Sequence, residues 1–236
     1  TAQLLHDKMP DMQNFNYHNP TRYVYGPGEH RNIGSLLKPY AQGRILLHYG
    51  GGSVIRSGLL QTVKDSLAEH GISHVELGGV KPNPSVELVR EGIELCRKEG
   101  VQLVLAVGGG SVIDSAKGIA LGALYDGDFW EFYSGKPAEK ALPVATVLTI
   151  AAAGSEGSTG SVITKEEGML KRSAGGDVLR PVFSIMNPEL TQTLPPYQTA
   201  CGVVDIMAHI FERYFTNTPD VEVSDHLCEG LLMTMI

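Results

Sequence analysis

Short apolar runs alternate with amphipathic segments over most of the first 150 residues. Four runs are expected to be strands: residues 44–49, 74–77, 102–107 and 144–149. The segments between them carry apolar residues at helical spacing, at about residues 57–70, 85–99 and 111–123. The run 102–107 is apolar at nearly every position, which is typical of a parallel strand buried on both faces. This order predicts an α/β fold with a parallel, helix-covered sheet.

Two aromatic-rich runs precede this region, at residues 15–17 and 22–25, and Asn19-Pro20 between them predicts a β-hairpin. Residues 158–164 and 180–186 are expected to be antiparallel strands, joined by the charged connection 165–177.

The chain then becomes helical. Pro195 and Pro196 favour a helix start. Residues 1–190 are therefore expected to form a dinucleotide-binding α/β domain, and residues 191–236 to begin an all-α domain. The last predicted helix, 220–236, closes on a mostly apolar run without a capping Gly or Pro, so we expect further chain after Ile236.

Composition narrows the function classes. The net charge is −7, from 19 basic and 26 acidic residues, which argues against a nucleic-acid partner, since that would need clustered Lys and Arg. No apolar run approaches the ~20 residues of a membrane helix, and the first ten residues lack a signal-peptide core. The chain has three cysteines that are far apart in sequence: Cys96, Cys201 and Cys228. This number and spacing predict neither a disulfide framework nor a metal site, so we expect inert core thiols and a cytoplasmic protein.

A glycine-rich turn after the run 102–107 is the first candidate site. Gly108, Gly109 and Gly110 are followed by Ser111 and Asp114. Three glycines let the backbone approach a ligand, and the amides at the following helix start suit a diphosphate. The motif is not GxGxxG, and a plain strand–helix turn is the alternative. We expect dinucleotide binding here, and we expect Gly109→Val to weaken it.

A second glycine turn, Gly50 to Ser53, follows the run 44–49. An NAD-preferring site usually places an acid at such a strand end, and none is present at Gly51, Gly52 or Ser53. With Arg56 nearby, the turn favours NADP over NAD, although a plain turn with a solvated Arg is the alternative.

Thr149 and Ser155 flank a stretch of small residues at another strand end. This stretch is expected to form a surface that a nicotinamide ring approaches, although small-residue loops are common. Further along, Asp205 and His209 stand four residues apart and therefore share a helix face, which suits two ligands of a divalent metal. Their apolar neighbours are expected to shield them from solvent.

These segments, in this order, resemble the iron-containing (group III) alcohol dehydrogenase family. Residues 108–117 match its GGGSxxDxxK segment, and residues 154–156 match the end of its T-x-x-x-T-G-S-E segment, where Ala153 stands in the place of a Thr that many members have. The resemblance implies that Asn83 and Lys171 contact the cofactor. It also implies that Asp205 and His209 hold Fe²⁺, and Zn²⁺ or Ni²⁺ would accept such ligands too. The turn 50–53 is similar to the NADP-preferring butanol dehydrogenase and aldehyde reductase subgroup.

By this resemblance the protein transfers a hydride between NAD(P) and a small primary alcohol or aldehyde, assisted by the metal, and is a homo-oligomer. No residue is assigned as a catalytic acid or base. The family holds its metal with one Asp and three His, and its last two histidines are missing here. One alternative is therefore a catalytically incomplete nucleotide-binding fragment. Another is a polyol-phosphate dehydrogenase or dehydroquinate-synthase-like relative, although no basic cluster surrounds Asp205 and His209.

Overall fold

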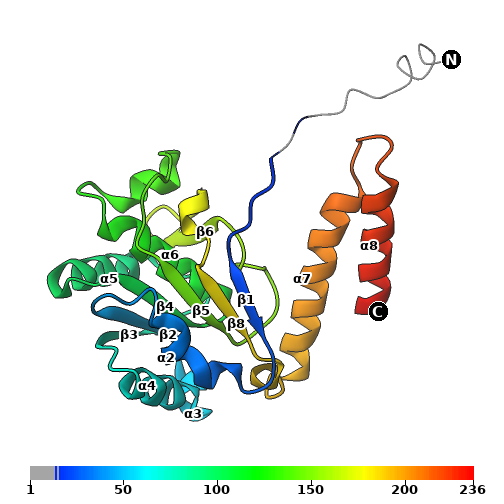
Figure 1. Cartoon of the computed structure of the whole chain (residues 1–236). Coiled ribbons are helices and arrows are strands. Elements are labelled where there is room, and N and C mark those ends of the chain that lie inside the picture. The colour runs from blue at the N-terminus through cyan, green and yellow to red at the C-terminus, as the bar shows by residue number, and fades with distance from the viewer. Residues whose placement is uncertain (1–13, 15) are drawn as a thin grey trace. The chain divides into compact units, whose positions relative to one another are not determined.

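Residues 14 and 16–236 are described by the computed structural model. They form two compact units: Pro20–Leu194, and Pro195–Ile236 together with the described residues before Pro20. The first unit is an α/β structure and the second is built from two helices (Figure 1).

The main sheet has six parallel strands in the order β1-β8-β5-β4-β2-β3. Their bounds are β1 Arg22–Tyr25, β2 Ile45–Gly50, β3 His74–Val80, β4 Leu103–Gly108, β5 Val144–Leu148 and β8 Phe183–Met186. A separate antiparallel pair consists of β6 Gly160–Lys165 and β7 Leu170–Gly175. The parallel sheet predicted from the apolar runs is confirmed.

Five α-helices of the first unit connect these strands: α2 Ile33–Leu37, α3 Gly52–Arg56, α4 Leu59–Glu69, α5 Val86–Glu99 and α6 Gly110–Ala123. Four 3-10 segments lie between them or beside the last strands: η1 Glu29–Asn32, η2 Phe129–Ser134, η3 Asp177–Leu179 and η4 Pro188–Thr191. The helices predicted at about 57–70, 85–99 and 111–123 are confirmed as α4, α5 and α6, whereas η1 and α2 were not foreseen.

Each face of the sheet carries its own apolar core. In β4, Val104 and Ala106 belong to the core formed with α5, α6 and η2, whereas Leu103, Leu105 and Val107 belong to the core formed with α2, α3 and α4. Successive residues of a strand point to opposite faces, so burial on both sides requires an apolar residue at every position. This is the physical reason for the uninterrupted apolar run.

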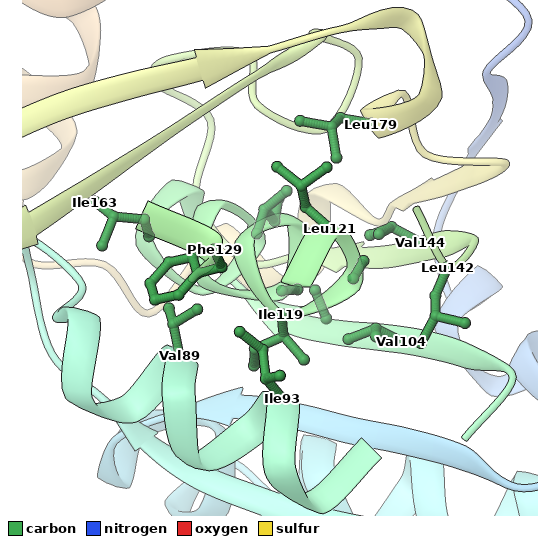
Figure 2. Packing of buried hydrophobic residues seen from close by; sticks show 14 of the residues in the cluster. Val89, Ile93, Val104, Ile119, Leu121, Phe129, Leu142, Val144, Ile163 and Leu179 are labelled. Atoms are coloured by element: carbon green, nitrogen blue, oxygen red, sulfur yellow. The ribbon is translucent and has the colours of Figure 1, made fainter. Parts of the chain in front are cut away.

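Figure 2 shows the first of these cores. Ile93 of α5 lies next to Ile119 of α6, with Val89 of α5 on one side of them and Val104 of β4 on the other. Because most residues of α6 are buried, the helix is held firmly against the sheet.

The helix ends follow local chemistry. The Ser85 side chain accepts a hydrogen bond from the Leu88 amide and caps α5, which ends at Gly100 in a left-handed conformation, φ 63°. Gly71, with φ 67°, adopts the same conformation just after α4. Serine as N-cap and glycine after the last turn are the residues that these positions favour.

Two strand predictions were wrong. Residues 22–25 do form β1, but it pairs in parallel with β8 in the main sheet, and 16–20 form no strand; Phe15 lies outside the described residues. The stretch 158–164 pairs with β7, which lies inside the expected connection, and not with 180–186. Both errors concern pairing, because an apolar or alternating run does not specify its partner strand.

The second unit consists of α7 Pro196–Tyr214 and α8 Glu222–Met235, as the helical periodicity predicted. They pack on each other, yet only Gly202 and Ile210 of α7 and Cys228 of α8 are buried. Cys96 is also buried, but Cys201 is exposed, which corrects the expectation of three core thiols. In the described part of the chain no helix combines the length and apolar character needed to span a bilayer.

Candidate functional site

The carboxyl ends of β2, β4 and β5 lie side by side along one edge of the sheet. Tyr49 is in register with Val107, and Gly108 with Leu148, so the two glycine turns and Thr149 follow neighbouring positions. The chain runs from β2 out to β3 and then returns to β4 on the other side of β2. Such a reversal opens a crevice outside the strand ends, which is where open α/β sheets bind ligands.

The turn after β4 leads directly into α6. Gly109 is its N-cap and Gly110 its first residue, so the amides at this helix start face the edge of the sheet. A Cβ on Gly108 would collide with Val112, which explains the glycine there by packing alone. A Cβ on Gly110 would meet open space. Gly110 is therefore the residue of this turn whose surface is free for a ligand.

Gly109 has a different environment. A Cβ there would come within 2.5 Å of the Ile150 side chain. A valine side chain at Gly109 would displace Ile150, because the turns after β4 and β5 lie against each other at this point.

The turn after β2 is open to solvent. Gly51, Gly52 and Ser53 are all exposed, and a Cβ on Gly51 would meet no atom within 4 Å. The guanidinium of Arg56 folds back against Gly52, leaving no room for a Cβ there. A cation therefore lies at the acid-free turn, in the place that the sequence suggested.

A hollow of about 250 Å³ adjoins this turn. Ser53 and Thr149 line it, and so do Glu189, Leu190 and residues 193–194. Glu189 was missed by sequence reasoning, because it lies some 130 residues from the turn and no local pattern marks it. Its carboxylate accepts hydrogen bonds from the Gly28 amide at 3.0 Å and the Asn187 side chain at 3.1 Å.

Asp114 is partly buried, one turn along α6. The Ser155 hydroxyl donates to its Oδ1 at 2.6 Å, and the Val162 amide donates to its Oδ2 at 3.2 Å. Burial raises the pKa of Asp114, and these hydrogen bonds together with the charge of Lys117 oppose the rise. Both candidate residues, Asp114 and Ser155, are thus bound to each other and shape the loop after β5.

Lys117 is a buried residue of α6 and the last residue of the GGGSxxDxxK segment. It is 0% exposed and its Nζ donates to the backbone oxygens of Ser155, Ser158 and Gly160 at 2.7–2.9 Å. Burial lowers the pKa of Lys117 to about 8, while the charges of Asp114 and Glu156 oppose that shift. The motif spacing brings Asp114 and Lys117 to one helix face, and this was the signal that could have revealed their partnership.

Lys171 of β7 reaches Asn83 in the loop that follows β3. Lys171 Nζ donates to Asn83 Oδ1 at 2.9 Å, and both residues are exposed. Asn83 has φ 57°, a left-handed conformation that asparagine tolerates better than most residues. Val80, which ends β3 shortly before Asn83, pairs with Gly50, so the Asn83 loop leaves the same edge as the glycine turns.

The metal candidates lie on α7, in the second unit. His209 Nε2 is 4.0 Å from Asp205 Oδ2, as expected for positions on one helix face, and each side chain is 47% exposed. The expectation of shielding by apolar neighbours is corrected, because α7 buries little of its own surface. Imidazole and carboxylate suit a borderline divalent ion, but they are two donors, and among the described residues no group of three or more metal-binding side chains occurs.

Comparison with known proteins places these features in a family. The sequence model of the iron-containing alcohol dehydrogenases matches residues 20–188. Over 226 residues the chain is 47% identical to a probable NADH-dependent butanol dehydrogenase of Bacillus subtilis, covering 95% of this chain and 58% of the relative. It is 40% identical to the NADPH-dependent aldehyde reductase YqhD of Escherichia coli, again covering 95% and 58%.

A solved structure agrees with the sequence comparisons. The NADH-dependent butanol dehydrogenase A of Thermotoga maritima superposes with a TM-score of 0.91 at 45% identity, over 95% of this chain and 56% of that protein. The chain thus spans about 58% of the length of the curated relatives it matches. With the parallel sheet, the paired glycine turns and the matched segment in place, the chain belongs to the iron-containing alcohol dehydrogenase family.

Proposed function

We propose that the crevice at the carboxyl ends of β2, β4 and β5 binds NADP(H), and that the protein transfers a hydride between this cofactor and a small primary alcohol or aldehyde. The observation that carries the proposal is the register of the strands, which sets the turns after β2 and β4 next to each other at the point where the strand order reverses. The names of the matched relatives, butanol dehydrogenases and an aldehyde reductase, support the substrate class.

The helix start at Gly110 would hold the diphosphate, because its amides and the dipole of a 14-residue helix favour an anion. Arg56, folded over Gly52, would face the 2′-phosphate that distinguishes NADP from NAD. The matched relatives differ on this point, since their names specify NADH in one case and NADPH in the other. The acid-free turn favours NADP here.

Asp205 and His209 would contribute two ligands to a divalent ion, iron by family. When bound, the ion supplies polarisation of the substrate oxygen and the nicotinamide supplies the hydride acceptor. The residues of this chain bind and orient: the glycine turns hold the cofactor's phosphates, and the loop after Thr149 faces its reactive end.

The nucleotide proposal is tested by titrating the 236-residue chain with NADPH and following the nucleotide's fluorescence. Gly110→Val places methyl groups at the open helix start and should lower affinity by roughly tenfold or more, since it removes amide contacts to a charged group. Gly230→Val is the matched control, because Gly230 is also helical and a Cβ there also meets no atom within 4 Å. Equal affinities in all three proteins would place the nucleotide elsewhere.

A second candidate is nucleotide binding without catalysis. It is favoured by one observation: the two metal candidates on α7 are half-exposed and make only part of a four-ligand set. Reduction of butyraldehyde by NADPH, assayed with and without added Fe²⁺ or Zn²⁺, distinguishes the two. Turnover that depends on the metal supports the dehydrogenase, and tight NADPH binding without turnover supports the binding module.

A further inference from the structure

The second half of the loop between β5 and β6 contains no helix or strand, yet its backbone oxygens accept hydrogen bonds. Side chains and one amide hold six consecutive carbonyls, those of residues 155–160. Lys117 donates hydrogen bonds to three of these carbonyls, those of Ser155, Ser158 and Gly160. The Ser184 hydroxyl donates to the Glu156 carbonyl at 2.6 Å, and Arg180 donates to the Gly157 carbonyl at 2.7 Å.

Lys117 is the centre of this arrangement. Its Nζ also lies 3.2 Å from both the Ser155 and the Ser158 hydroxyl, so five oxygens surround one ammonium group. An ammonium has three N–H donors, and the three carbonyls at 2.7–2.9 Å are the shorter contacts. The side chain is fully buried, and a buried charge is retained only where hydrogen bonds and counter-charges offset its desolvation.

The charged groups around Lys117 come from three segments. Asp114 lies on its own helix, Glu156 lies on the loop, and Arg180 approaches from beyond η3. Tyr133 of η2 contacts the neighbouring Ser161 hydroxyl at 2.6 Å. Two carboxylates thus balance Lys117 and Arg180, and all four groups bear on the same loop.

From this geometry we infer that Lys117 is a positioning residue, which orients the loop 154–160 so that its outer surface forms one wall of the nucleotide crevice. Lys117 lies on α6, whose N-terminus carries the glycine turn, and the turn itself touches Ile150. The same helix therefore presents amides at its start and fixes the neighbouring loop seven residues later. The inference rests on the proposed function, because it assigns the loop to that crevice.

The first test uses Lys117→Met, which keeps the volume of the side chain and removes the ammonium. We expect faster hydrogen exchange at the amides of residues 154–161, and an NADPH affinity lowered by roughly tenfold or more, because three carbonyls of the loop lose a charged donor. Lys140→Met is the matched control: Lys140 is exposed, and that variant should leave both readouts unchanged.

Chemical rescue separates positioning from a general loss of stability. In Lys117→Ala the missing atoms correspond to n-propylammonium, so this ion should refill the buried cavity and restore loop protection and NADPH affinity. Tetramethylammonium at equal concentration is the control, because it carries the charge without any N–H donor. If Lys117→Met fails to fold, Arg180→Met tests the same loop through the Gly157 carbonyl, with the same two readouts.

The outcomes are distinct. Unchanged exchange in folded Lys117→Met overturns the inference. A loosened loop with unchanged NADPH affinity overturns it too, since the loop would then lie apart from the crevice. Rescue by tetramethylammonium as effective as by n-propylammonium would remove the role of directed N–H donors. If the unaltered chain itself binds no NADPH, the proposed function fails. This result differs from a failure of the inference, because it is seen before any residue is substituted.

Discussion

The buried His48 side chain has a hydrogen-bond partner at each of its ring nitrogens. His48 of β2 is fully buried, with Nδ1 2.8 Å from the Leu77 carbonyl and Nε2 2.8 Å from the Ser115 hydroxyl. A carbonyl can only accept, so Nδ1 carries the proton and Nε2 accepts from Ser115. The neutral ring satisfies both partners, and burial lowers the pKa of His48 to about 4.

This pairing predicts a loss of stability in mild acid. The unfolded histidine titrates near 6.5 and the folded one near 4, so the stabilisation is present above pH 6.5 and is lost as the pH falls toward 4. The difference corresponds to about 3 kcal/mol. Urea unfolding at a series of pH values measures this change in the free energy of unfolding, with His48→Gln as comparison, because glutamine does not titrate. An equally steep pH dependence in both proteins would contradict the assignment to His48.

Cofactor choice is also decided by single residues. Gly51 has a negative φ of −76° and open space around it, so an Asp side chain has room there. Gly51→Asp should reverse the order of affinities from NADPH-preferring to NADH-preferring, because a carboxylate repels the 2′-phosphate and accepts from the ribose hydroxyls. Gly51→Asn is the neutral control of equal size. Tighter NADH than NADPH binding in the unaltered chain, measured by titration, would disprove the NADP preference.

Single elements are positioned by their ends as well as by their apolar faces. The helix α5 begins at the Ser85 cap, beside which the Thr164 amide of β6 donates to the Pro84 carbonyl at 2.9 Å. The start of α5 and the antiparallel pair β6–β7 are therefore joined. Lys171 of β7 reaches Asn83 in the same region, so the cap, the hairpin and two proposed cofactor residues form one local assembly.

Removing the cap should weaken this assembly measurably. Ser85→Ala removes the acceptor of the Leu88 amide and is expected to lower the free energy of unfolding by about 1 kcal/mol. Ser85→Asp should retain most of the cap's contribution to stability, because a carboxylate also accepts from that amide. Ser173→Ala is the control, because Ser173 is an exposed residue of β7. Chemical denaturation gives the three values. An equal loss in Ser85→Ala and Ser173→Ala would mean that the cap contributes nothing specific.

For the whole molecule, the two units differ in how much apolar surface they bury. The α/β unit has a core on each face of its sheet, whereas the helical pair buries three residues among the described elements α7 and α8. Local stability follows buried apolar contacts. We therefore expect amides of α7 and α8 to exchange with solvent much faster than those of β4 in native-state hydrogen exchange. Comparable protection of the amides in β4 and in the two helices would contradict the expected difference in local stability.

Metal binding is a property of the whole molecule, because a tight site draws ligands from several elements. Asp205 and His209 provide two, so the 236-residue chain should retain a divalent ion weakly and lose it on dialysis. Elemental analysis after dialysis measures the content, with His209→Ala as comparison and His226→Ala, an exposed histidine of α8, as control. One tightly held ion per chain that persists in His209→Ala would move the metal site elsewhere.

The local pattern of the sequence determined the strands β2, β3, β4 and β5 and the helices α4, α5 and α6, where α5 begins and where the glycine turns fall. It also placed Asp205 and His209 on one helix face. These features depend on residues within a few positions of each other, through side-chain periodicity, capping and glycine's conformational freedom.

Only the tertiary structure decided which strands pair. It placed β1 beside β8, although they are some 160 residues apart, and it paired β6 with β7. It brought Glu189 to the hollow beside Ser53, and it directed the Lys117 ammonium to three carbonyls of a distant loop. Such contacts form between distant parts of the chain, because burial and hydrogen bonding select among partners that the local pattern leaves equivalent.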